Sequence, residues 1–206
     1  MTAVPLRIVV ADDHPIVLDG LKTLLAGAPD MQIVGIVTSF SAVITLLAQL
    51  SADVLILDLH GMGSAPLALV ARLQREHPHT KILIFSSNYD FAPELLQTGV
   101  CGYVTKEELG QHLLAAIRAV HRGERYLSRV VQEAIDVPGR TQPLSQSELV
   151  VLKLLARGLG TEAIAAQMGI LTRSTQNYIT DLRRKLNCAE RTQLVDWYRR
   201  VYGDEA

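Results

Sequence analysis

Short apolar runs alternate with longer amphipathic stretches along the first 122 residues of the chain. The apolar runs are rich in β-branched residues, and they occupy residues 7–11, 33–37, 54–57, 81–85 and 102–105. Because these runs are almost continuously apolar, they indicate strands buried on both faces, as in a parallel sheet covered by helices. Between them, apolar residues recur at helical spacing near 15–26, 41–50, 65–76, 91–98 and 108–122. The pattern predicts a doubly wound α/β domain with a five-stranded parallel sheet.

The alternation ends at about residue 123. After the next twenty residues, the chain shows only helical patterns. Residues 136–143 join turn-forming and polar residues without periodicity, which is typical of a linker. We therefore expect three parts of the chain. They are a first domain over residues 1–122, a linker over 123–142 and a small all-α domain over 143–206.

The second domain begins with a helix-start signal. Ser145 stands three residues before Glu148, as in a capping box. Further helices are expected over residues 161–168, 173–186 and 191–202. The first two of these are short and are separated by a tight turn at Gly169, which is typical of a helix-turn-helix domain.

Composition narrows the class of protein. With 206 residues, of which 49% are apolar and 20% charged, the chain can fill two ordinary cores, which excludes a disordered protein. Two distant cysteines, Cys101 and Cys188, exclude a disulfide scaffold and a thiolate zinc cluster. The histidines are too scattered for a ligand set, and we expect them on the surface or in loops. Neither a secretory signal nor a membrane span is visible, so we expect a cytoplasmic protein with no membrane partner.

Charged and hydroxyl side chains follow the predicted strands at the points where these end. Asp12 and Asp13 follow the first strand, and Asp58 follows the third. Ser86 and Lys106 follow the fourth and the fifth. The carboxyl ends of parallel strands meet at one edge of a sheet, so we expect these groups to lie together.

Carboxylates crowded in this way repel each other unless a cation lies among them. Oxygen ligands suit Mg²⁺, which accepts phosphate as a further ligand, and a lysine with a hydroxyl would stabilise a phosphoryl group in transfer. A single aspartate at a strand end is more often a helix cap or a solvated turn. The conjunction of all five groups favours a magnesium-dependent site for phosphoryl transfer.

The first domain resembles the receiver domain of two-component response regulators, which has a flavodoxin-like fold, over residues 5–122. The resemblance rests on Ala-Asp-Asp-His-Pro at 11–15 and Gly-Tyr-Val-Thr-Lys at 102–106, which are specific to the NarL/FixJ subfamily. It implies that a histidine kinase phosphorylates Asp58. It also implies a Mg²⁺ ion on Asp12, Asp13, Asp58 and the backbone carbonyl of His60, with Asp12 acting through water.

The same resemblance implies roles for three further residues. Lys106 pairs with the phosphate, Ser86 moves inward to bond a phosphate oxygen, and Tyr103 changes rotamer in step. One departure concerns the loop 60–63, which reads His-Gly-Met-Gly where the family usually has Met-Pro. Because two glycines make this loop more permissive, the metal-binding carbonyl is expected to be less preorganised.

The predicted helix 173–186 has two different sides. At 100° per residue, its apolar side contains Thr175, Tyr178, Ile179, Leu182 and Leu186. Its polar side presents Arg173, Asn177, Thr180 and Arg184, flanked by Gln176 and Asp181. Asn and Gln can read adenine edges, Arg can bind guanine or phosphate, and Thr can contact a thymine methyl. A polar face alone is usually the solvated side of a bundle helix; the helix-turn-helix order and the linked receiver favour DNA binding.

The second domain resembles the LuxR-type DNA-binding domain. The matching segments are 152–159, 164–165, 185–186 and 191–192. The resemblance implies that Gln176, Asn177 and Thr180 read bases in double-stranded promoter DNA. It also implies phosphate contacts by four cationic residues, which are Arg173, Arg184, Lys185 and Arg191.

The start of the recognition helix departs from this family. The usual Ser-x-x-Thr-Val-Lys reads Leu171-Thr-Arg-Ser-Thr-Gln176, so that Leu171 occupies the cap position and Gln176 replaces a lysine. Thr172 is an alternative cap, one residue later. Fewer cations on the DNA-facing side predict a shallower dependence of binding on salt than is usual for the family.

The sequence thus indicates a response regulator in which phosphorylation controls DNA binding and transcription. It is expected to pair as a homodimer on two half-sites when active, and to be no enzyme beyond its own phosphoryl transfer and dephosphorylation. Two alternatives remain open. One is a regulator of the same architecture that works without phosphorylation. The other is an Asp-nucleophile phosphohydrolase, for which the chain lacks a long cap insertion and a second acid placed as acid/base after Asp58.

Overall fold

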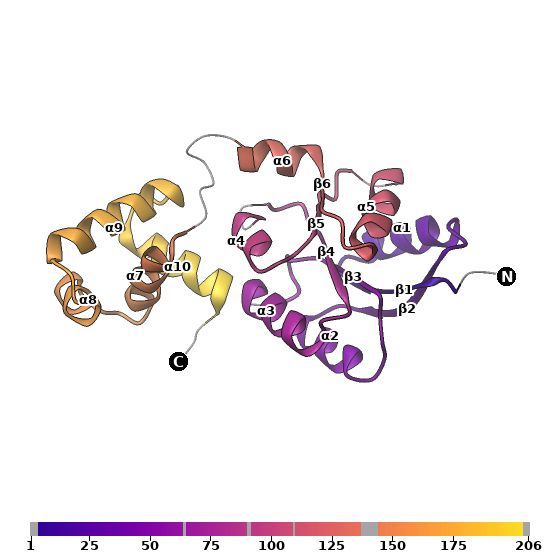
Figure 1. Ribbon diagram of the computed structural model, residues 1–206, viewed down its shortest axis with the longest axis horizontal. Helices are drawn as coiled ribbons and strands as arrows, with labels where there is room; N and C mark the ends of the chain where they lie inside the picture. The colour runs from indigo at the N-terminus through magenta and orange to yellow at the C-terminus, as the bar shows by residue number, and fades with distance from the viewer. Residues whose placement is uncertain (1–3, 64, 90–91, 109, 137–143, 204–206) are drawn as a thin grey trace.

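The first domain alternates strands and helices (Figure 1). The computed structural model describes residues 4–63, 65–89, 92–108, 110–136 and 144–203. The strands are β1 (Leu6–Ala11), β2 (Met31–Val37), β3 (Val54–Leu57), β4 (Lys81–Phe85) and β5 (Gly102–Val104). The helices are α1 (Pro15–Ala26), α2 (Phe40–Leu47), α3 (Pro66–Glu76), α4 (Ala92–Gln97) and α5 (Gln111–His121). The predicted α/β alternation is confirmed.

The strands form one parallel sheet in the order β2-β1-β3-β4-β5-β6. Successive side chains of β1 point to opposite faces, and all four from Ile8 to Ala11 are buried. Ile8 and Val10 pack with α1 and α5, while Val9 and Ala11 pack with α2, α3 and α4. Helices therefore cover both faces, which explains why the strands are continuously apolar.

The register of the sheet brings the strand ends together. Ala11 pairs with Leu57, Leu57 with Ile84, and Phe85 with Val104. The residues that directly follow β1, β3, β4 and β5 therefore emerge at one edge, as the sequence predicted.

The sheet has six strands, so the prediction of five was wrong. β6 (Tyr126–Leu127) pairs in parallel with β5, and α6 (Arg129–Asp136) follows it and buries Val131. The first part of the predicted linker 123–142 is thus structured and belongs to the first domain. A strand of two residues is too short to show a hydrophobic period. The rest of the predicted linker, residues 137–142, lies outside the described residues.

The second domain consists of α7 (Gln146–Ala156), α8 (Thr161–Met168), α9 (Thr172–Lys185) and α10 (Arg191–Tyr202). The predicted capping box is present. Ser145 Oγ accepts the backbone N–H of Glu148, and Glu148 Oε2 accepts the backbone N–H of Ser145 at 2.7 Å. Gly169 ends α8 in the left-handed conformation, with φ 66°, which produces the tight turn before α9.

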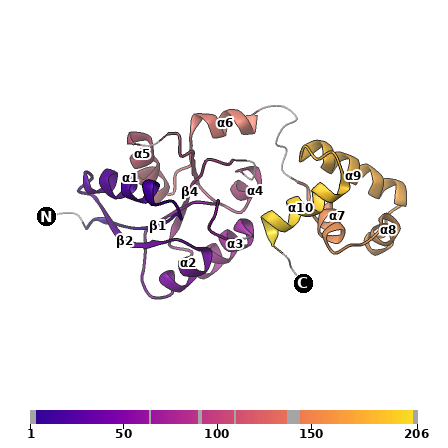
Figure 2. The same ribbon diagram turned by 180° about the vertical axis from the view of Figure 1, so that it is seen from behind.

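Helix α10 connects the two domains. It packs against α7 and α9 and also against α3 of the first domain. Figures 1 and 2 both show α10 between the domains, with α8 and α9 farther from the sheet. Near this contact, Glu94 of α4 is buried, and the charge of its carboxylate acts on the phenol of Tyr202. No helix in the described part of the chain is long and apolar enough to cross a bilayer.

Candidate metal centre and nucleic-acid interface

Asp58 lies at the centre of a charged cluster at the carboxyl edge of the sheet. It directly follows β3 and is only 1% exposed. The backbone N–H of Leu59 donates to its Oδ1 at 2.7 Å, and Lys106 Nζ donates to its Oδ2 at 2.7 Å. Because each oxygen has its own donor, the carboxylate is held in one orientation.

Lys106 links Asp58 to a second buried carboxylate. Its Nζ lies 2.8 Å from Oδ2 of Asp12, which is 2% exposed. The lysine side chain is itself largely buried, so its charge is poorly screened and stabilises both anions. One lysine does not balance Asp12, Asp13 and Asp58 together, and an excess of negative charge remains.

The remaining contacts of the carboxylates fit a divalent cation. Oδ1 of Asp13 and Oδ2 of Asp12 are buried and accept no hydrogen bond of good geometry from the described residues. The carboxylate of Asp13 also rests against the backbone of Gly61, where a Cβ would come within 2.0 Å of Oδ2. Gly61 has φ 70°, so both its conformation and its lack of a side chain make room for Asp13. The unusual loop 60–63 therefore has a steric reason.

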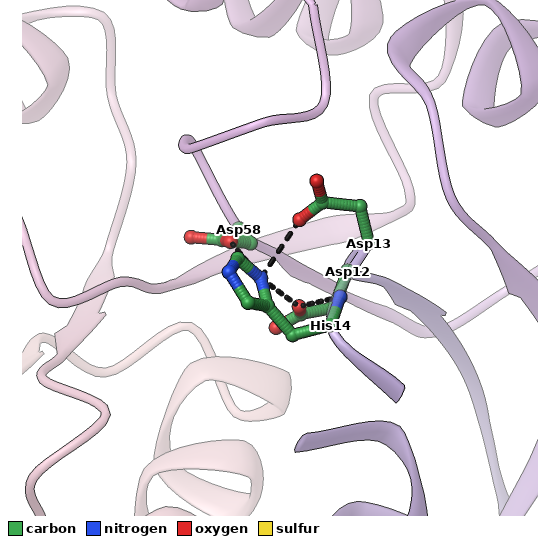
Figure 3. Close-up of side chains that lie close together, drawn as sticks. All are labelled: Asp12, Asp13, His14 and Asp58. Atoms are coloured by element: carbon green, nitrogen blue, oxygen red, sulfur yellow. Dashed lines mark hydrogen bonds and ion pairs between the residues drawn. The ribbon is translucent and has the colours of Figure 1, made fainter. Parts of the chain in front are cut away.

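His14 joins this cluster, which the sequence did not predict. Its Nδ1 lies 3.2 Å from Oδ1 of Asp12, 2.8 Å from Oδ1 of Asp13 and 3.9 Å from Oδ2 of Asp58 (Figure 3). The backbone N–H of His14 donates to Asp12 Oδ1 at 2.9 Å, which turns the chain back over the strand end. Its proximity to Asp13 along the chain was the only available signal, because the direction of a ring is set by its rotamer.

Ser86 and Tyr103, the predicted switch residues, both form a hydrogen bond with the backbone of Asn88. Both are fully buried. Ser86 Oγ accepts the backbone N–H of Asn88 at 3.4 Å, and the Tyr103 hydroxyl donates to the carbonyl of the same residue. Asn88 belongs to the connection from β4 to α4, so a movement of either side chain acts on that connection.

The second domain presents an exposed polar face on α9. The predicted apolar side is confirmed, since Thr175 and Leu182 are buried and Tyr178, Ile179 and Leu186 pack against the core. The opposite side contains five of the predicted DNA contacts, all of them exposed. They are Arg173, Gln176, Asn177, Thr180 and Arg184. The exposure of these side chains leaves this face of α9 open to a partner.

Two of the predicted phosphate contacts, Lys185 and Arg191, have partners within the domain. Lys185 Nζ lies 2.8 Å from Glu148 Oε1, and both side chains are largely buried. Burial raises the pKa of the Glu148 carboxyl, but the hydrogen bonds from Lys185 and Ser145 lower it by more. Arg191 donates to the carbonyl of Leu159 and to the hydroxyl of Thr161. The phosphate contact of Lys185 stays a prediction, and its ammonium group also holds α9 to the start of α7.

Leu171 precedes α9 at the N-cap position. It makes no side-chain capping hydrogen bond, and it is 76% exposed. The alternative cap, Thr172, is the first residue of the helix itself. The departure from the usual serine thus leaves the start of α9 without a hydroxyl cap.

Comparison with known families assigns each domain. Residues 8–118 match the response regulator receiver domain, and residues 142–198 match the family described as bacterial regulatory proteins, luxR family. These matches cover the acidic cluster around Asp58 and the exposed face of α9.

Individual relatives agree with both assignments. The chain is 28% identical to the oxygen regulatory protein NreC of Staphylococcus carnosus, covering 93% of this chain and 96% of that protein. A structure of two RcsB dimers bound to two parallel DNAs superposes with a TM-score of 0.71 at 25% identity, covering 96% and 99% of the two chains. Salmonella enterica RcsB, bound to a promoter with the phosphomimetic BeF₃⁻, gives 0.67 at 26% identity, covering 93% and 97%.

Proposed function

Because the chain belongs to the response regulators that join a receiver domain to a luxR-type DNA-binding domain, we propose that phosphorylation of Asp58 by a histidine kinase controls its binding to promoter DNA. The observation that carries the proposal is the arrangement of Asp58. Its buried carboxylate is oriented by Leu59 and Lys106 and lies beside two further carboxylates. Such a group is a fixed nucleophile in an environment prepared for phosphate charge.

The residues around Asp58 would have different roles in phosphoryl transfer. An oxygen of Asp58 forms a bond to phosphorus while the bond from phosphorus to the histidine nitrogen of the kinase breaks. Asp12, Asp13, Asp58 and the His60 carbonyl would hold Mg²⁺, which supplies positive charge for the phosphate oxygens and aligns them. Lys106 already touches Asp58 and is placed to pair with the phosphate. No protein base is needed, since the attacking carboxylate carries no proton.

The signal would leave the pocket through Ser86 and Tyr103. Their shared contact with Asn88 connects the phosphate side of β4 to α4. Helix α4 lies near the contact with α10, where the charge of Glu94 acts on Tyr202. A rearrangement of this connection would therefore change how the DNA-binding domain is held.

The exposed side of α9 is the proposed DNA-reading surface. Asn and Gln suit adenine, Arg suits guanine or phosphate, and Thr suits the thymine methyl. RcsB has been seen as dimers on DNA, and we extend pairing on two half-sites to this chain. A single helix-turn-helix domain has a small footprint, which a dimer doubles. The luxR family consists of bacterial regulatory proteins, and bacterial promoters lie in the cytoplasm, where this protein would act.

The test is phosphorylation by acetyl phosphate in the presence of Mg²⁺, followed by Phos-tag electrophoresis. We expect a retarded band for the wild type that Asp58→Asn abolishes. Asp19→Asn is the matched control, because Asp19 is an exposed aspartate of α1 that pairs with Lys22. A retarded band that persists in Asp58→Asn would refute the assignment. An unmodified wild type that still binds DNA would favour the regulator that works without phosphorylation. Steady release of phosphate from small phosphoesters would favour the phosphohydrolase.

A further inference from the structure

His14 stands apart from the other residues of the metal centre because it offers nitrogen. It lies between Asp13 and the first residue of α1, Pro15, with an extended backbone of φ −94° and ψ 110°. This conformation and its bond to Asp12 direct the ring over the carboxylates (Figure 3). Half of the side chain remains exposed, so the ring forms part of the mouth of the pocket.

The spacing of the donor atoms fits a single ion. One donor atom from each of Asp12, Asp13, His14 and Asp58 lies within 4.8 Å of all the others. Donor atoms held at about 2.1 Å from one ion lie roughly 3 to 4 Å apart. Two of the distances from His14 Nδ1 to the three carboxylates, 3.2 and 3.9 Å, lie in that interval, and the third, 2.8 Å, is slightly shorter.

The ring nitrogen of His14 is in direct contact with two carboxylates of the cluster. Nδ1 lies 2.8 Å from Asp13 Oδ1, yet this buried oxygen makes no hydrogen bond of good geometry with any described residue. A cation held by these carboxylates would lie within reach of Nδ1 as well. The longer contact, to Asp12 at 3.2 Å, has hydrogen-bond geometry.

We infer that His14 Nδ1 is a protein ligand of the metal centre and makes the site prefer a first-row transition cation, such as Mn²⁺ or Co²⁺, over Mg²⁺. Carboxylate oxygens alone suit Mg²⁺. An imidazole nitrogen binds first-row transition cations more tightly than it binds Mg²⁺. The inference rests on the proposed function only in so far as the carboxylates bind a cation. It adds a ligand and a metal preference to the pocket.

The test is electron spin echo spectroscopy of the full-length protein loaded with Mn²⁺ alone. We expect the nitrogen modulation of a coordinated imidazole in the wild type, and we expect His14→Ala to abolish it. His60→Ala should retain it, since this exposed histidine is the other ring at the pocket mouth, with centroids 6.5 Å apart. Titrations should show that His14→Ala lowers the ratio of Mn²⁺ to Mg²⁺ affinity about 10-fold.

Three results would overturn the inference. The first is a wild type without nitrogen modulation, a result that needs no variant to fold. The second is a modulation that His60→Ala removes and His14→Ala retains. The third is tighter binding of both cations by His14→Ala, which would mean that the ring occupies the place of the ion. In each case, phosphorylation of Asp58 with Mg²⁺ would still support the proposed function. Nitrogen modulation without phosphorylation would support the ligand and contradict that function.

Discussion

Gly61 shows how one residue shapes the acidic pocket. Its φ of 70° is a conformation that side chains with a Cβ adopt at a cost, and the space beside it is filled by the Asp13 carboxylate. Gly123 has a similar φ of 79°, but nothing lies within 4 Å of the place where its Cβ would be. A comparison of substitutions at the two glycines therefore distinguishes the cost of backbone strain from the effect of a new side chain on the pocket.

We predict that Gly61→Ala and Gly123→Ala each lower the free energy of unfolding by about 1–2 kcal/mol. Only Gly61→Ala should also weaken divalent-cation binding, by about 10-fold, because the new methyl group displaces Asp13. Urea denaturation and isothermal titration measure the two effects. Equal cation affinity in both variants would show that Asp13 is not needed at its position.

At the scale of residues, the sequence predicted the acids and the lysine of the pocket but not its histidine. Asp12, Asp58 and Lys106 were predictable because strand order alone brings their backbones to one edge. The ring of His14 was not, because its place depends on a rotamer and on a hydrogen bond to Asp12. From the sequence, Gly61 was expected to make the loop 60–63 more permissive. That it leaves space for the Asp13 carboxylate became clear only from the position of Asp13.

At the scale of elements, α9 combines a face that packs with a face that is free. Lys185 belongs to the first, since it pairs with the buried Glu148 of α7. Arg184 belongs to the second, since it is exposed and pairs with Asp181 of the same helix. These adjacent cations should therefore have opposite effects when they are removed.

We predict that Lys185→Ala lowers the free energy of unfolding by about 2 kcal/mol, because it leaves a buried carboxylate without its cation. Arg184→Ala should change stability by less than about 0.5 kcal/mol, as is usual for an exposed pair. It should instead weaken DNA binding and reduce the slope of log K against log salt by about 1. If Lys185→Ala kept the wild-type stability and reduced the slope of log K against log salt, Lys185 would instead act as a phosphate contact.

Element boundaries followed the sequence for most elements, but α6, which has eight residues, was missed because it lies in the predicted linker. The capping box at Ser145 and the glycine after α8 predicted their helix ends correctly. β6 was missed because two residues carry no period, and the partner of Lys185 was missed because Glu148 lies 37 positions away. Long-range pairing of this kind is decided by packing and leaves no local signal.

At the scale of the whole molecule, the contact between the domains contains a buried acid. Burial raises the pKa of Glu94 to about 7, although a backbone hydrogen bond lowers it. Its Oε2 has no hydrogen-bond partner among the described residues. Tyr202 of α10 is the neighbouring titratable group, and burial followed by the Glu94 charge raises its pKa as well.

This acid predicts a pH dependence of stability. The folded protein holds the Glu94 proton more tightly than the unfolded chain, whose carboxyl has the ordinary pKa of 4.5. The resulting stabilisation is complete below that value and is lost as the pH rises through about 7, with a total of about 3 kcal/mol. Urea denaturation at pH 5 and pH 8 should show a smaller difference for Glu94→Gln than for the wild type. An unchanged difference would contradict the burial of this charge.

The most direct test of the account is the affinity of the full-length protein for promoter DNA with and without acetyl phosphate and Mg²⁺. Phosphorylation should raise the affinity of the wild type and of Asp19→Asn about 10-fold, a coupling of ordinary size. The affinity of Asp58→Asn should not respond. Equal affinities under both conditions, or the same response in Asp58→Asn, would contradict the claim that this aspartate controls the DNA-binding domain.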